Sequence, residues 1–435
     1  MDVNLFPVDP SMKSVTFTIA GIIVAICCWA GGLAFAITQG WTKNDIAPDG
    51  DLDGFSQAVV ETLDASSAGN YAFTLLHDGT IGSEQFASAG RPVDGNTLFQ
   101  MASISKWVTS WGIMKLVENG QIDLDAPVGD YLSRWALPAT DYDNREVTTR
   151  RLLSHTAGFA DGLGYGGFET LEEVQTLEAS LTEAADAFDP ESSGAGINLP
   201  ADGTMRYSGA SYTLLQLLIE EVSGRDFNEY MREEILVPLG MSRSTFVIDR
   251  RNETNLAEFY DTDGSIATHY YYTALAAASL YTSSNDMVRF LTAHCEGPDG
   301  ESPGRGILSG ETLSAMRIPH ARNYGVKIWG LGPILYGNND SGGYVIGHDG
   351  GNRPAINTTA RIDPYSCDGI VLLTSGTEGL ASKMGSDWVY WHTGRVGAVE
   401  FLGETQPLLN TFFVGSGVIL LVGSFIRWRY RRNKT

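Results

Sequence analysis

The residues best suited to chemistry in this chain are a serine and a lysine three positions apart, Ser103 and Lys106, in the run Ser-Ile-Ser-Lys. A serine hydroxyl is a weak nucleophile near neutral pH and needs a base placed beside it. On a helix, residues three positions apart lie on the same face, so the lysine amine can reach the hydroxyl. Lys106 is also the only lysine with a serine three residues before it. The spacing therefore predicts a serine nucleophile activated by a lysine.

The sequence after Ser103 predicts the element that would hold both groups, a helix over 105–119 that ends at Gly120. Its apolar residues are expected toward one side of the helix; they are Val108, Ile113, Met114 and Leu116. Ser103 would then lie at the helix N-terminus, where backbone amides stabilise the oxyanion formed during acyl transfer. Residue type and position together indicate acyl transfer.

Three more blocks accompany this one: Leu-Leu-Ser-His-Thr-Ala-Gly at 152–158, Tyr-Ser-Gly at 207–209 and His-Asp-Gly at 348–350. Together with Asn-Thr-Leu-Phe-Gln-Met-Ala-Ser-Ile-Ser-Lys at 96–106, they resemble the serine β-lactamase and penicillin-binding-protein family. The resemblance is to its class C β-lactamases, D-alanyl-D-alanine carboxypeptidases and family-VIII-type esterases, and it covers about residues 55–395. It implies an α+β fold of the β-lactamase/transpeptidase kind, with an antiparallel sheet flanked by helices, a helical subdomain and the site between them.

The resemblance also implies a role for each matching residue. Ser103 would attack the acyl carbon, and Lys106 would accept or relay its proton. Tyr207 would act as a second base and later as the acid for the leaving group. The backbone amides of Ser103 and Gly351 would form the oxyanion hole. His348 replaces the lysine of the family's Lys-Thr-Gly motif, and it would either polarise Tyr207 or bind a substrate carboxylate.

Three departures from the family pattern bear on the substrate. Gly209 stands where β-lactamases and carboxypeptidases carry an asparagine whose amide contacts the substrate. Asp349 places an anion where many relatives receive a substrate carboxylate, and Pro354 stiffens the stretch that follows. These differences disfavour β-lactams and favour neutral esters or amine-bearing peptides. The residues expected to contact the substrate are His348, Asp349, Gly350 and Gly209.

Neither a cofactor nor a metal is expected, because the seven histidines show no metal-ligand spacing. The segment 49–54 opens like a calcium-binding loop, but Val60 occupies the position that needs a bidentate glutamate, so we expect a solvated turn. His155 is a tempting base, but its block is structural in the resembling family, which predicts a supporting role. The aromatic run 270–272 could line the cleft or pack half-buried in the interior.

Two apolar segments predict the topology. The first, 14–37, has 24 uncharged residues and is long enough to cross a membrane as a helix. A cleaved signal peptide is the alternative, supported by Ala34-Phe35-Ala36, but the segment exceeds the usual length and only Lys13 flanks it with a positive charge. The second, 408–426, is followed at once by an arginine-rich tail. The positive-inside rule places this tail in the cytoplasm and 38–407 outside it.

The chain is therefore expected to carry one catalytic domain between two membrane spans. Its parts are a cytoplasmic segment (1–12), a transmembrane helix (13–37), an acidic linker (38–54), the catalytic domain (55–395) with a helical subdomain at about 122–260, a linker (396–407), a second transmembrane helix (408–426) and a basic cytoplasmic tail (427–435). The catalytic domain would lie on the outer side of the cell membrane, in the periplasm of a Gram-negative cell. The net charge of −23 disfavours nucleic acid as a partner.

Within the catalytic domain, the apolar patterns predict a sheet assembled from both ends of the domain. A hairpin is predicted over 71–90 with its turn at His77-Asp78-Gly79, and further strands at 343–346, 355–362 and 369–375. Helices are predicted at 55–64, 212–223, 285–294 and 383–393, the second of them ended by Gly224.

Two questions stay open at the level of sequence. Cys295 and Cys367 could form a disulfide outside the cytoplasm or remain separate thiols. The protein could be a hydrolase that acts through an acyl-enzyme on a small-molecule or peptide substrate, or a degenerate relative that serves as a membrane scaffold or an accessory subunit of a membrane complex. Gly209 supports the second alternative, whereas the nucleophile and both candidate bases support the first.

Overall fold

The structure is a computed structural model, and it describes residues 10–38, 40–41, 43, 45–159, 163, 166–188, 193–250, 252–353, 355–403 and 405–432. Pro354, which was expected to stiffen the stretch after the His-Asp-Gly block, lies outside these residues. The chain forms two compact units. One is Asp45–Thr393, and the other combines the terminal segments Met1–Asn44 and Gly394–Thr435.

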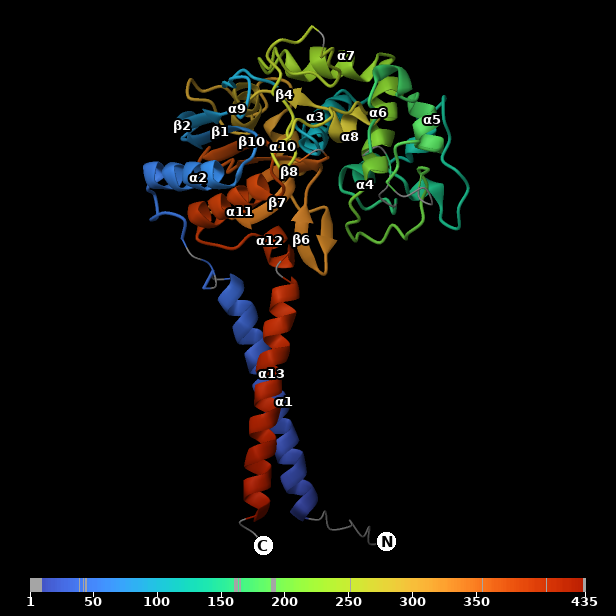
Figure 1. Ribbon diagram of the computed structural model, residues 1–435. Helices are drawn as coiled ribbons and strands as arrows, with labels where there is room; N and C mark the ends of the chain where they lie inside the picture. The colour runs from blue at the N-terminus through green and yellow to red at the C-terminus, as the bar shows by residue number, and fades with distance from the viewer. Residues whose placement is uncertain are drawn as a thin grey trace. The chain divides into compact units, whose positions relative to one another are not determined.

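The larger unit is built on an antiparallel sheet of eight strands in the order β2-β1-β10-β9-β8-β7-β6-β5 (Figure 1). Because β1 from the start of the unit pairs with β10 from its end, the prediction of a sheet assembled from both ends of the domain is confirmed. The strands are β1 (Asn70–His77), β2 (Thr80–Ala87), β5 (Ala321–Asn323), β6 (Val326–Trp329), β7 (Ile334–Asn338), β8 (Tyr344–Asn352), β9 (Ile356–Ile362) and β10 (Gly369–Ser375). A small second sheet pairs β3 (Phe99–Gln100) with β4 (Tyr281–Thr282).

The hairpin of β1 and β2 turns at the predicted position. Asp78 and Gly79 have positive φ angles of 49° and 70°, as in the hairpin turns whose twist matches that of the flanking strands. β8 runs to Asn352 instead of ending at residue 346, so the His-Asp-Gly block lies inside the sheet. The sequence does not predict β5, β6 and β7, because strands of three to five residues are too short to show an alternating pattern.

Helices cover the sheet and form a region beside it (Figure 1). The helices against the sheet are α2 (Leu52–Ser66), α3 (Ile104–Glu118), α9 (Ser284–Thr292) and α11 (Leu380–Thr393). α10 (Gly310–Met316) follows α9 along the chain. The helical region contains α4 (Thr149–Leu153), α5 (Leu177–Thr182), α6 (Gly209–Ser223), α7 (Phe227–Met231) and α8 (Leu275–Ala278).

α6 agrees with its prediction at the C-terminal end, where Gly224 has φ 67°. It begins at Gly209, three residues earlier than predicted, because the Ser208 side chain accepts a hydrogen bond from the Ser211 amide at 3.2 Å and caps the helix. The Tyr-Ser-Gly block therefore lies at the N-terminus of α6.

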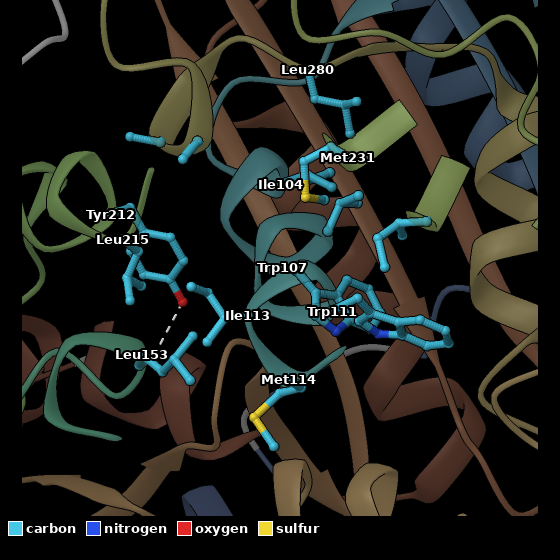
Figure 2. Close-up of a cluster of buried hydrophobic side chains, with 14 of the residues drawn as sticks. Ile104, Trp107, Trp111, Ile113, Met114, Leu153, Tyr212, Leu215, Met231 and Leu280 are labelled. Carbon is cyan, nitrogen blue, oxygen red and sulfur yellow. Dashed lines mark hydrogen bonds between the residues drawn. The ribbon is translucent and has the colours of Figure 1, made fainter. Parts of the chain in front are cut away.

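α3 carries the Ser-Ile-Ser-Lys run, and Gly120 ends it as predicted, with φ 69°. The expectation of a single apolar side is wrong, because 12 of its 15 residues are buried. α3 packs against β8 and β9 and against α6, α7 and α8. Toward α9, the rings of Trp107 and Trp111 (labelled in Figure 2) lie 4.9 and 5.3 Å from the ring of Phe290. The helix that positions Ser103 and Lys106 is thus held on nearly all sides.

Cys295 and Cys367 form a disulfide, with their Cα atoms 5.9 Å apart. The bond joins the chain just after α9 to the turn between β9 and β10. Of the two alternatives that the sequence leaves open, the paired state is the one found.

The smaller unit contains α1 (Pro10–Thr38), α12 (Ala398–Gly403) and α13 (Thr405–Arg432). α1 packs against α13, and Gly415 of α13 lies so close to the Trp29 ring that a Cβ there would collide with it. The stretches Phe17–Ile37 and Leu408–Tyr430 are long and apolar enough to cross a membrane, judged by length and composition alone.

Candidate active site

Ser103 lies directly before the first residue of α3. It is the only residue of 97–114 that is not buried, so solvent reaches this serine and not its neighbours. Ala102, just before it, has φ 45°, in the left-handed region that is strained for a residue with a Cβ. The Met101 amide donates to the Leu280 carbonyl at 2.8 Å and helps to hold this turn. The Ser103 hydroxyl is therefore accessible to solvent, whereas the residues around it in 97–114 are buried.

Lys106 is fully buried, and its Nζ lies 3.1 Å from Ser103 Oγ, as the spacing predicts. The same Nζ donates to the Ala277 carbonyl of α8 at 2.8 Å and lies 4.8 Å from the centre of the Tyr207 ring. α8 is fixed to α3 by a second contact, in which Thr109 Oγ1 donates to the Ala276 carbonyl at 3.2 Å. This contribution of α8 is not predictable from sequence, because a backbone carbonyl has no residue-type signal.

Tyr207 is half-buried beside Lys106, and His155 holds the chain on both sides of it. The Arg206 amide donates to the His155 carbonyl at 2.7 Å, and the Ser208 amide donates to His155 Nδ1 at 3.1 Å. The His155 ring also packs 4.6 Å from the Tyr207 ring. Because Nδ1 accepts a hydrogen bond, the proton of the neutral ring is on Nε2. These contacts agree with a supporting role for His155, that of positioning Tyr207.

His348 is buried next to the same group, with its ring 6.3 Å from that of Tyr207. Its Nδ1 donates to the Asp349 carbonyl at 2.6 Å, which leaves Nε2 as an acceptor. Burial and the nearby Lys106 lower the pKa of His348 to about 4. A neutral imidazole can accept a hydrogen bond from a hydroxyl, but near pH 7 it does not offer the positive charge that a lysine would offer to a carboxylate.

Asp349, which was expected to add an anion where relatives receive a substrate carboxylate, is ion-paired in the structure. Its carboxylate pairs with the buried Arg361 of β9, whose Nη2 lies 3.0 and 2.9 Å from the two oxygens. It also accepts from Thr359 Oγ1 at 2.5 Å. Arg361 in turn donates to the Ser382 carbonyl of α11. Side chains alternate along a strand, so Asp349 faces α11 while His348 faces Lys106.

Gly350 brings β8 against the chain that leads to Ser103. A Cβ at this position would collide with the Met101 carbonyl and with Thr358 Oγ1, and Thr358 Oγ1 itself donates to that carbonyl at 3.0 Å. Gly351 follows at the exposed rim of the strand. Among the described residues, the Ser103 amide donates no hydrogen bond and so is available to an oxyanion.

A buried polar network supports the end of β8, and no sequence motif pointed to it. Asn352 Nδ2 donates to the Tyr272 hydroxyl at 2.8 Å, and Gln100 Nε2 donates to the Tyr281 hydroxyl at 3.0 Å. Tyr272 belongs to the aromatic run 270–272, and it is 3% exposed. This ring therefore packs in the interior, and its hydroxyl holds the end of β8 through Asn352.

The segment 49–54 is a helix cap in the structure. Asp51 Oδ1 accepts from the Gly54 amide at 2.9 Å at the start of α2. Among the described residues, no three or more His, Cys, Asp or Glu side chains converge in a way that could hold a metal ion.

Four buried histidines make the stability of the larger unit sensitive to acid. Burial lowers the pKa of His269 and His294 to about 3, that of His348 to about 4 and that of His155 well below its usual range. As pH falls below about 6.5, the unfolded chain takes up protons that the folded chain cannot accept until its lower pKa values are reached. The free energy of unfolding should therefore fall between pH 6.5 and 4, by on the order of 2–3 kcal/mol for His348 alone. Melting temperatures measured from pH 7.5 to 4.5 check this, and a flat or rising profile would contradict it.

Comparison with known proteins agrees with this geometry. Residues 55–398 match the Beta-lactamase family. Penicillin-binding protein 4 of Amycolatopsis lactamdurans is 28% identical over 326 residues, which cover 72% of this chain and 78% of that protein. Esterase EstB of Burkholderia gladioli is 29% identical over 166 residues, or 37% of this chain and 41% of that one.

The fold is shared with solved structures as well. The octameric penicillin-binding protein homologue from Pyrococcus abyssi superposes with a TM-score of 0.62 at 24% identity, over 78% of this chain and 77% of that chain. The match of 55–398 covers most of the larger unit, including all the residues that surround Ser103. The chain thus belongs to the Beta-lactamase family and is a serine hydrolase of its β-lactamase and penicillin-binding-protein kind.

Proposed function

We propose that this protein is a membrane-anchored serine hydrolase that acts through an acyl-enzyme at Ser103 on a neutral ester or a D-amino-acid peptide outside the cytoplasm. The observation that carries the proposal is the 3.1 Å contact between Lys106 Nζ and Ser103 Oγ, beside the Tyr207 ring, at the one residue of 97–114 that solvent reaches. The nucleophile contacts one candidate base, and the ring of the second lies beside that base, which supports covalent catalysis.

In the proposed reaction, Ser103 Oγ attacks the acyl carbon while its proton is relayed by Lys106 to Tyr207. The developing oxyanion is stabilised by the amides of Ser103 and Gly351. Tyr207 then returns the proton to the leaving group, and the acyl group remains as an ester of Ser103. Water, deprotonated by the same pair, attacks this ester and releases the acid, which restores the serine hydroxyl.

The choice of substrate rests on three residues, Gly209, His348 and Asp349. Gly209 lacks the side-chain amide through which relatives contact a substrate amide. His348 is neutral near pH 7, so it gives little attraction to the carboxylate that a β-lactam carries. Asp349 does not support an amine-bearing substrate, because Arg361 neutralises it. Uncharged esters and short peptides therefore fit the proposal better than β-lactams.

The catalytic domain (55–395) is proposed to lie on the outer side of a membrane that the chain crosses at 13–37 and 408–426. The arginine-rich end of α13 favours a cytoplasmic tail. The Cys295–Cys367 disulfide favours an oxidising compartment for the larger unit.

A membrane-impermeant fluorophosphonate applied to intact cells tests chemistry and location together, with intact-protein mass spectrometry as the readout. We expect one adduct on the wild type, none on Ser103→Ala, and an unchanged adduct on Ser110→Ala. Ser110 is the matched control, because it is a buried serine of α3 whose hydroxyl donates only to the Trp107 carbonyl, at 2.6 Å. Ester turnover should fall by about 10³-fold or more in Ser103→Ala alone.

The outcomes separate the parts of the proposal. Labelling of Ser103→Ala would refute the nucleophile, and labelling only after lysis would refute the location. A folded wild type that neither reacts with the probe nor hydrolyses any of a panel of esters, D-alanyl-D-alanine peptides and cephalosporins would favour the degenerate scaffold or accessory subunit instead.

A further inference from the structure

A cavity of about 420 Å³ lies in the helical region, and neither Ser103, Lys106, Tyr207 nor His348 lines it. Its walls come from α5, α6, the stretch 246–248 and the run 271–273 that leads into α8. This volume is within the range of small-molecule sites. It is therefore a second hollow, separate from the groups around the nucleophile.

One wall of the cavity is connected to the catalytic lysine through α8. Gln216 of α6 lines the cavity, and its Oε1 accepts from the Ala276 amide at 3.1 Å. Its Nε2 donates to the Thr273 carbonyl at 3.2 Å, just before α8. The carbonyl of Ala277, the residue that follows Ala276 in α8, accepts from Lys106 Nζ at 2.8 Å. α8 has four residues, so a displacement on the cavity side moves the carbonyl that Lys106 contacts.

A second connection runs through Tyr272. Its ring lines the cavity, while its hydroxyl accepts from Asn352 at the end of β8. Asn352 directly follows Gly351, one of the two proposed oxyanion donors. The cavity is thus joined by hydrogen bonds both to the proposed base and to the proposed oxyanion hole.

The lining selects the chemistry of a ligand. Apolar side chains form the interior, among them Leu177, Phe246, Ile248 and Leu275. Three carboxylates, of Glu178, Glu220 and Asp226, also line it, against one guanidinium, that of Arg134. Arg134 pairs with Glu220 at 2.5 Å and with Glu178 at 3.3 Å. The lining therefore has an excess of two negative charges, which favours an ammonium group joined to an apolar body.

We propose that this cavity is a second ligand site, which takes an amphipathic cation, and that its occupancy changes the reaction at Ser103 through α8. The binding half of this proposal stands on the cavity alone. The claim that ligand binding changes the reaction rate at Ser103 rests also on the proposed function.

Calorimetric titration of the full-length protein in a non-ionic detergent tests binding. The probes are 4-phenylbutylammonium and, with the same body, 4-phenylbutanol and 4-phenylbutanoate. We expect the ammonium to bind at least 5-fold tighter than the alcohol, and the carboxylate to bind weakest. Val247→Trp, at the lining, should weaken the ammonium at least 10-fold. Val237→Trp is the matched control, because Val237 is 46% exposed against 47% for Val247, and it does not line the cavity.

Ser103→Ala should bind the ammonium with wild-type affinity, because the proposed site excludes the nucleophile. Equal binding by the wild type and Val247→Trp, or no preference for the ammonium over the alcohol, would overturn the site. In an ester assay, the ammonium should change kcat at least 2-fold in the wild type and in Val237→Trp. A purely competitive rise in KM would instead place the probe in the catalytic cleft and overturn the proposal. The titration uses no substrate, so it tests the cavity independently of catalysis. A wild type without ester turnover would count against the proposed function, and the binding data would still decide whether the cavity is a ligand site.

Discussion

Replacing Lys106 with methionine is expected to lower the turnover of a neutral ester by about 10³-fold or more. Methionine keeps the apolar stem in its buried place but removes the amine that contacts Ser103 Oγ at 3.1 Å. The serine hydroxyl then has no buried base on its own helix. The measurement is kcat and the rate of single-turnover acylation with p-nitrophenyl butyrate, on protein shown to be folded by its melting curve.

Lys115 supplies the matched control for this substitution. It lies on the same helix α3, and its Nζ also donates to a backbone carbonyl, that of Ile307 at 3.1 Å. Lys115→Met should retain turnover within about 3-fold, since it removes an amine and a carbonyl contact without approaching Ser103. If Lys106→Met and Lys115→Met lost activity equally, or Lys106→Met lost little, the assignment of Lys106 as a catalytic residue would be refuted.

Replacing Arg361 with methionine is expected to cost about 3–5 kcal/mol of the free energy of unfolding, the largest stability effect that we expect from one substitution. The Arg361 side chain is 1% exposed and pairs with both oxygens of Asp349. Its guanidinium also lies 3.7 Å from the centre of the Tyr336 ring. Without Arg361, the carboxylate remains largely buried in the sheet with no opposite charge. Denaturant or thermal unfolding measures the loss.

Two variants separate the buried pair from ordinary charge effects. Lys383→Met removes an ion pair with Asp387 on α11, but Lys383 is 65% exposed, so this change should cost less than about 1 kcal/mol. The double variant Arg361→Met with Asp349→Leu should recover part of the loss, because it no longer leaves an unpaired charge inside. A cost for Arg361→Met no larger than that for Lys383→Met would show that the pair contributes little.

The parts of the site that were predictable from sequence are those whose geometry is local. Ser103 and Lys106 share one helix, so their spacing alone brings the two groups together. The start of α6 at the Tyr-Ser-Gly block and its end at Gly224 follow from capping residues. The Ala277 carbonyl, by contrast, is 171 residues from Lys106, and only the packing of α8 against α3 brings it there.

Asp349 shows what a residue-by-residue match to a motif leaves out, namely its ion-pair partner Arg361. The sequence shows that a carboxylate replaces a small residue at position 349. It does not show on which face of the sheet that side chain lies. That face depends on the register of β8 against β9, which sets His348 opposite Ala360 and Asp349 opposite Thr359. The same register places Arg361 within reach. Its charge could be assigned to Asp349 only once the two strands were paired.

The pairing of β1 with β10 also governs when this protein can fold during its synthesis. Asn70 lies opposite Ser375, so nearly the whole domain must leave the ribosome before β1 and β10 can pair. Until then the hairpin of β1 and β2 has an open edge, which is the kind of surface on which chains aggregate. The nascent chain therefore exposes this edge until β10, the last strand of its sheet, has been made.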